Sequence, residues 1–159
     1  MDEIRITLAA TQQESGELDR LLWDVLWQPV GFPRNVRDSF KLDGKGLEFV
    51  ALAGDEMVGG LVANWTSQTQ VEIRHIAVVP DWQHQGVGRQ LVTTLIAEVS
   101  AEACSLVHTI ARNTSVIFFE KLGFAKLPGG PLEHPEFSKH GISFEKMERV
   151  SSTHSRNAT

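Results

Sequence analysis

The sequence DWQHQGVGRQL, residues 81–91, joins an apolar segment to an amphipathic one. The apolar run at 73–79, closed by Pro80, predicts a strand before it, and the apolar spacing over 89–103 predicts a helix after it. The first turn of a helix has backbone N–H groups without intrahelical partners, and the helix dipole adds partial positive charge there. Gly86 and Gly88 would let the backbone approach a bulky anion closely. The stretch therefore predicts a phosphate-binding turn, with a tight turn whose glycines serve only packing as the alternative.

Two common phosphate-binding motifs do not fit this stretch. A Walker-type loop needs Gly-Lys-Ser or Gly-Lys-Thr, whereas Gly88 is followed by Arg89. A dinucleotide fingerprint would place its third glycine where Leu91 stands. It also needs alternating parallel strand–helix units from the start, whereas a hairpin is expected at 48–64.

The apolar pattern predicts one mixed α+β domain over residues 1–150, in the order β-α-α-β-β-β-α-β-α-β-β. Gly59 and Gly60 stand inside one expected strand and indicate a bulge or a close backbone approach. Asn113 is expected to cap a helix that Gly123 ends. The segment 151–159 is small and polar, and we expect a disordered tail. Strands are expected over 4–9, 48–53, 57–64, 71–79, 105–111, 124–127 and 142–150, and helices over 14–27, 36–42, 89–103 and 114–122.

Composition limits the partners of the chain. Of the 159 residues, 42% are hydrophobic and 22% charged, which is ordinary for a globular domain, and the formal net charge is −5. An acidic balance without a Lys/Arg run argues against nucleic-acid binding, and no apolar run is long enough for a membrane span. Cys104 is the only cysteine and the N-terminus lacks signal-peptide order, so we expect a cytoplasmic protein.

Two motifs in order resemble the GNAT superfamily of acyl-CoA-dependent N-acyltransferases. The first is the strand IRHIAVVP at 73–80 followed by Gln83-x-x-Gly86-x-Gly88 and an amphipathic helix. The second is NTSVIFFEKLGF at 113–124, which is similar to the family's Asn-containing helix that ends in Gly-Phe. The resemblance implies a mostly antiparallel sheet, splayed at the cofactor-binding strand and flanked by about four helices.

The resemblance also implies that acetyl-CoA lies where the strand and the turn separate. The backbone of Ile76, Ala77 and Val78 would form hydrogen bonds to the pantetheine arm. A backbone N–H near Val78 would donate to the oxyanion of the tetrahedral state. Asn113 and Phe119, in the second motif, would also lie at the cofactor. Turn residues complete the set: Gln83 and His84 at its entrance, and the amides of Gln85, Gly86, Val87, Gly88 and Arg89 around the pyrophosphate. No metal is implied.

Attack of an amine on a thioester requires a base, because an amine is mostly protonated near pH 7. Glu72 is the first candidate, since it lies eleven residues before Gln83, the spacing of the strand glutamate in the histone-acetylating branch of the family. His108 is the second, because it lies five residues before Asn113, where some members place a catalytic glutamate. For each the alternative is a structural side chain, and His75, on the opposite strand face from Glu72, is expected to be structural.

The second motif departs from the family pattern. The usual proton donor to the CoA thiolate is a tyrosine at the position of Phe119, and the sequence contains no tyrosine. Asn113 lies six residues before Phe119, where seven is usual. The leading hypothesis is transfer of an acetyl group from acetyl-CoA to a primary amine of a small molecule or peptide, by direct attack in a ternary complex. The alternatives are an acyl-CoA-binding regulator or degenerate member, and an interaction domain without a cofactor.

Nothing in the sequence identifies the acceptor amine. The family places the acceptor between the first helices and the loop before the last strand, where aromatic and basic residues occur on both sides. Core packing is the alternative for the tryptophans among them. Edge pairing of the last strand is a route to a homodimer. The acceptor candidates are Trp23, Trp27, Phe32, Arg34, His134, Phe137 and His140.

Overall fold

The computed structural model describes residues 3–40 and 44–151, and divides into two compact units. Unit 1 contains residues 1–64 and 74–95, and unit 2 contains residues 65–73 and 96–159. Strand β4, Gln70–Val78, and helix α2, Val87–Ser100, each contribute residues to both units. Among the described residues, no helix combines the length and apolar character needed to cross a bilayer.

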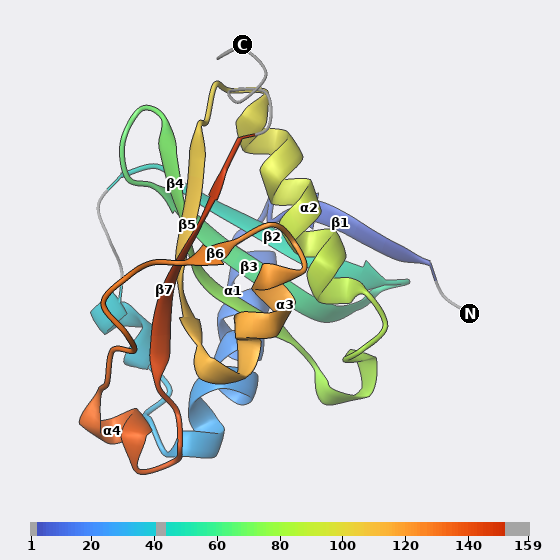
Figure 1. The fold of residues 1–159 in the computed structure, drawn as a ribbon. Helices are drawn as coiled ribbons and strands as arrows, with labels where there is room; N and C mark the ends of the chain where they lie inside the picture. The colour runs from blue at the N-terminus through green and yellow to red at the C-terminus, as the bar shows by residue number, and fades with distance from the viewer. Residues whose placement is uncertain (1–2, 41–43, 152–159) are drawn as a thin grey trace. The chain divides into compact units, whose positions relative to one another are not determined.

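Unit 1 is built on an antiparallel meander (Figure 1). Strand β1, Ile4–Leu8, pairs with β2, Gly46–Ala53, which pairs with β3, Glu56–Trp65. The β2–β3 register shifts after the pair of Ala51 with Gly59, so that Val58 has no partner on β2. The bulge expected near the paired glycines is therefore present.

Helix α1, Gln12–Leu22, begins in a reciprocal cap. The Thr11 hydroxyl accepts from the Glu14 amide at 3.1 Å, while the Glu14 carboxylate accepts from the Ala10 amide at 2.9 Å. The helix expected over 14–27 continues past its α-helical part as a π-helical turn, Trp23–Trp27. A 3₁₀ turn, Gln28–Val30, follows and ends at Gly31 with a φ of +86°, and a second, Val36–Phe40, replaces most of the helix expected over 36–42. Residues 41 and 42 of that prediction lie outside the described residues.

Gly59 and Gly60 on β3 give the close approach that their positions predict. A Cβ at Gly60 would lie 2.1 Å from Leu18 Cδ1, so α1 packs directly on the backbone there. A Cβ at Gly59 would lie 3.1 Å from both the Ala77 carbonyl oxygen and Val87 Cγ1. The two glycines therefore let α1 on one side and the start of α2 on the other come close to the same strand.

Replacing Gly60 by Ala is expected to lower the free energy of unfolding by about 1–3 kcal/mol, because an added methyl group overpacks a filled core. Leu18 is fully buried, so its side chain would have to move within the packed core. Gly16→Ala on α1 is the control: nothing lies within 4 Å of its Cβ position, and a helix-interior Gly→Ala change should stabilise by about 0.5–1 kcal/mol. Urea unfolding of both variants measures the difference. Equal stability of Gly60→Ala and the parent would refute the close packing.

Unit 2 is a second group of strands. Residues 70–73 of β4 pair in parallel with β5, Leu106–Arg112, and β5 pairs antiparallel with β7, Phe144–Val150. The short β6, Ala125–Lys126, adds to β7 (Figure 1). One face of these strands is buried and apolar, with Val107 and Met147 at 4% and 0% exposure. The opposite face carries His108 and Glu148, and this difference between the faces determines the site described below.

Two short helices complete unit 2. Helix α3, Val116–Glu120, follows a 3₁₀ turn, Asn113–Ser115, and Gly123, with a φ of +93°, stops it as expected. Helix α4, Pro135–Ser138, lies in the loop expected before the last strand. The hydrogen-bonded strand order is β1-β2-β3-β4-β5-β7-β6, so the predicted α+β class with a mostly antiparallel sheet and four α-helices is confirmed. The predicted splay of the sheet stays a prediction, as does the tail, because 152–159 lie outside the described residues.

Candidate active site

The turn between β4 and α2 is held closed by two glutamine side chains. Gln83 Nε2 donates to the Val78 carbonyl at 2.9 Å, and Gln85 Nε2 donates to the Asp81 carbonyl at 3.0 Å. Two residues of the turn adopt positive φ, His84 at 64° and Gly86 at 87°. Left-handed residues within such a turn aim successive backbone N–H groups in one direction, as in anion-binding nests.

Helix α2 begins with free amides. The Gly86 carbonyl accepts from the Gln90 amide at 3.0 Å, so Gly86 caps a helix that starts two residues earlier than expected. Within residues 44–151, we find no backbone acceptor for the N–H groups of Gly86, Val87, Gly88 and Arg89. Nothing lies within 4 Å of a Cβ built on Gly86. The turn thus presents four donors and open space, which is what a phosphate group requires.

Residues 74–78 of β4 lead directly into this turn. Ala77 is 5% exposed, whereas Ile76 and Val78 are half-buried and share the opposite strand face. The Val79 amide donates to the carbonyl of Val58, the unpaired bulge residue, at 2.9 Å. The bulge therefore fixes the point at which β4 ends and the turn begins.

An aromatic cluster packs against β4 from the first third of the chain. The His75 ring meets Trp27 edge-on with centroids 4.9 Å apart, and Phe40 lies 5.8 Å from Trp27. Trp27 is only 3% exposed, so it belongs to the core. The structural role expected for His75 agrees with this packing.

Ion pairs fix the segment after α1. Arg37 is 11% exposed at its side chain and joins Asp19 at 3.2 Å to Glu48 at 2.7 Å. Arg34 pairs with Asp19 and lies 5.9 Å from the centre of the Trp23 ring, whose Nε1 donates to the Phe32 carbonyl. Burial alone would raise the pKa of Asp19, but hydrogen bonds and positive charge from both arginines outweigh it and lower that pKa. The acceptor candidates Trp23, Phe32 and Arg34 are thus held in one fixed group.

The two candidate bases, Glu72 and His108, are neighbours. They are direct partners in the parallel register of β4 and β5, so their side chains leave the same face of adjacent strands. Glu72 is 7% exposed, while His108 is half-buried. The sequence points to each of the two residues separately, and their adjacency is not visible in it because a single sequence does not show strand register.

A family model decides the classification. The model of the acetyltransferase (GNAT) domain matches residues 45–126, which is more than half of the chain and includes the turn. The chain belongs to the GNAT acetyltransferase family. Both motifs that carried the resemblance lie within this range.

Solved structures of acetyltransferases are similar to this chain over nearly its whole length. A Bacillus subtilis acetyltransferase in complex with CoA is 25% identical over 94% of this chain and 99% of that chain, with a TM-score of 0.69. A GNAT acetyltransferase from Elizabethkingia anophelis with acetyl-CoA bound is 18% identical over 95% and 100%, at a TM-score of 0.68. The ribosomal-protein-S18-alanine N-acetyltransferase from Escherichia coli is 17% identical over 93% and 94%, at 0.72. The structures from Elizabethkingia anophelis and Escherichia coli are less than 25% identical to this chain, so their similarity shows the shared fold alone.

Asn113, in the second GNAT motif, has a different structural role from the one predicted. The expected N-cap role is wrong, because α3 begins at Val116 and its capping residue is Ser115. Asn113 instead uses both ends of its amide on the loop before β7: Nδ2 donates to the Gly141 carbonyl at 3.2 Å, and Oδ1 accepts from the Ser143 amide at 3.1 Å. Its predicted contact with the cofactor stays a prediction.

Phe119, at the position of the missing tyrosine, lies in the core of unit 2. It is 2% exposed and packs edge-on against Phe118 and Phe124, with centroids 5.1 and 5.2 Å apart. Its contact with the cofactor also stays a prediction. In the loop, Phe137 is 4% exposed and the His134 ring accepts from the Glu136 amide, so both stabilise α4. In the part of the chain that is described, no group of three His, Cys, Asp or Glu side chains could hold a metal ion.

Proposed function

We propose that this GNAT protein is an N-acetyltransferase that moves an acetyl group from acetyl-CoA to a primary amine of a small molecule or peptide, by direct attack in a ternary complex. The observation that carries the proposal is the turn at 83–89, where four amides, which have no backbone acceptor among the described residues, face open space at the start of a helix. The relatives from Bacillus subtilis and Elizabethkingia anophelis, which bind CoA and acetyl-CoA, support the same ligand.

The described residues fit acetyl-CoA at this turn. The amides of Gly86, Val87, Gly88 and Arg89 would bind the pyrophosphate, and the positive charge of the helix dipole would complement it. The backbone of Ile76, Ala77 and Val78 would hold the pantetheine arm. Acetyl-CoA supplies the activated acetyl group as a thioester, and every other step belongs to residues of the chain or to the amine.

Glu72 is proposed as the base that removes a proton from the acceptor ammonium. The amine nitrogen then forms a bond to the acetyl carbon, the bond from that carbon to sulfur breaks, and the nitrogen loses its second proton to solvent. The products are an amide and CoA, with one proton released overall. Because Phe119 has no hydroxyl, solvent is proposed to protonate the leaving thiolate, whose modest basicity makes it a reasonable leaving group.

Incubation with acetyl-CoA and a broad panel of amines, with free thiol as the readout, tests the function. We expect amine-dependent thiol release for at least one amine. The absence of a tyrosine favours a second candidate, a CoA-binding regulator without catalysis. Calorimetric binding of acetyl-CoA together with blank-level thiol release across the panel would support that second candidate and refute the first.

A further inference from the structure

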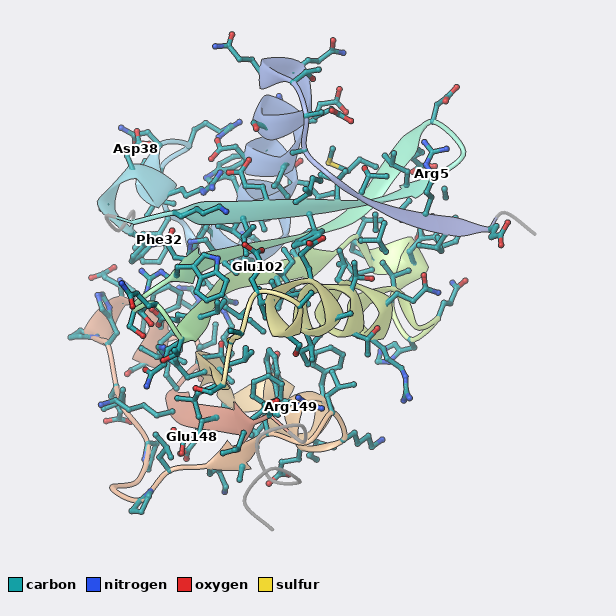
Figure 2. All side chains as sticks on the ribbon, turned by 90° about the horizontal axis from the view of Figure 1, so that it is seen from above. Arg5, Phe32, Asp38, Glu102, Glu148 and Arg149 are labelled. Carbon is teal, nitrogen blue, oxygen red and sulfur yellow. The ribbon has the colours of Figure 1, made fainter. Side chains whose placement is uncertain are left out.

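A row of acid–base side chains crosses three strands of unit 2. Glu72 on β4 is the register partner of His108 on β5, and His108 is the register partner of Glu148 on β7. Glu148 and the next residue, Arg149, leave β7 in different directions, and Arg149 donates to the Leu122 carbonyl (Figure 2). His108 and Glu148 form an antiparallel pair, in which Cβ atoms lie about 4.5–5.5 Å apart. Glu72 and His108 are partners on parallel strands, which lie about 4.8 Å apart, so the three side chains are neighbours on one sheet face.

The buried end of this row needs an exit for protons. Glu72 is 7% exposed, and a carboxylate that takes a proton from an amine must release it before the next cycle. Its neighbour His108 is half-buried and therefore reaches solvent. Histidine exchanges protons readily near neutral pH. For His108 to accept a proton from Glu72, one ring nitrogen must carry a free lone pair.

The contacts of Thr66 favour one of the two ring nitrogens for this lone pair. The Thr66 hydroxyl oxygen lies 3.1 Å from His108 Nε2 and 3.3 Å from the Gln70 carbonyl oxygen. A carbonyl oxygen only accepts, so the hydrogen bond between Thr66 and Gln70 uses the single hydroxyl proton of Thr66. In that arrangement the Thr66 hydroxyl oxygen accepts from Nε2–H of His108. This tautomer of the neutral ring has its lone pair on Nδ1.

We propose that His108 is the proton exit of Glu72 and that Thr66 is the positioning residue that keeps its Nδ1 free to accept. The inference rests on the proposed function for its catalytic part. The proton taken from the ammonium passes from the Glu72 carboxyl to His108 Nδ1, directly or through one water, and from there to solvent. Nε2–H donates to Thr66 whether the ring is neutral or charged, so the ring keeps its orientation throughout.

The charged groups that face His108 suit this task. Glu72 and Glu148 flank it on β4 and β7, and both complement the positive charge that the ring gains in transit. Lys146 lies on the same strand as Glu148, two residues away and therefore on the same face. Lys146 is exposed, so its charge is largely in solvent. Of these residues, only Glu72 and His108 are indicated by their spacing from a sequence motif.

The nitrogen-15 NMR spectrum of the histidine rings tests the tautomer without any substrate. We expect the His108 signal, assigned by its loss in His108→Gln, to place the proton on Nε2 in the parent and in Thr66→Ser. Thr66→Val should give a mixture of tautomers. Thr93→Val is the matched control, because the exposed Thr93 hydroxyl on α2 also donates to a backbone carbonyl. A proton on Nδ1 in the parent, or an unchanged tautomer in Thr66→Val, would overturn the role of Thr66.

Kinetics test the exit role. Thr66→Val is expected to lower kcat about tenfold with KM for acetyl-CoA unchanged, Thr66→Ser to restore it, and added imidazole to raise the kcat of His108→Ala. Glu72→Gln should not respond to imidazole. A His108→Ala variant at full rate, or one that imidazole does not rescue, would refute the exit. Failure of the parent to turn over any amine would refute the proposed function instead, and the NMR result would still decide the tautomer.

Discussion

Gly86→Val is expected to raise the dissociation constant of CoA about a hundredfold or more. Hydrogen bonds to a charged group contribute about 1.5–3 kcal/mol each, and the loss of two of them corresponds to that factor. A Cβ at Gly86 would project into the open space in front of the free amides, where the pyrophosphate is proposed to bind. A β-branched residue would also be strained at a φ of +87° and would move the amides themselves.

Gly54→Val provides the matched control. Gly54 also has a positive φ, +61°, and nothing lies within 4 Å of its Cβ position, but it stands in the β2–β3 hairpin of unit 1. Both variants therefore carry backbone strain, and only one alters the turn. Calorimetric titration with CoA separates the two effects. Equal CoA affinity in Gly86→Val and Gly54→Val would show that the turn is not the pyrophosphate site.

Glu72→Gln is expected to lower kcat by about 10²–10⁴-fold, which is the usual contribution of a positioned base. The amide has nearly the shape of the carboxylate, so the buried position stays filled, but it does not accept a proton at neutral pH. The KM for acetyl-CoA should remain within about twofold, because the residue is proposed to act on the amine rather than on the cofactor. Steady-state rates at saturating acetyl-CoA measure the change.

Glu148→Gln is the comparison for this prediction. It removes a carboxylate from the same sheet face, one strand beyond His108, and leaves Glu72 in place. We expect a much smaller loss of kcat from it than from Glu72→Gln. If the two variants lose the same activity, the effect would be a general one of negative charge, and Glu72 would not be the base.

The sequence predicted most of the fold because local signals were strong. Apolar alternation identified the seven strands to within a few residues, and the glycines of 83–89 identified the turn. The paired glycines at 59 and 60 gave both the bulge and the helix contact. These features depend on side-chain size and backbone freedom at single positions, which a sequence states directly.

The site was less predictable because it depends on pairing between distant segments. The adjacency of Glu72 and His108, and the place of Glu148 beside them, follow from register across β4, β5 and β7. Asn113 looked like a helix cap, yet its amide is used by a loop about thirty residues later. Thr66 belongs to no motif, and only its distance to His108 motivates the role proposed for it.

Amine-dependent release of free thiol from acetyl-CoA is the most direct test of the central claim. We expect release above the blank for at least one primary amine, a lower rate in Glu72→Gln, and a sharply weaker affinity for acetyl-CoA in Gly86→Val. Thiol release that stays at the blank across a broad amine panel, in a protein that calorimetry shows to bind acetyl-CoA, would contradict the assignment as an N-acetyltransferase.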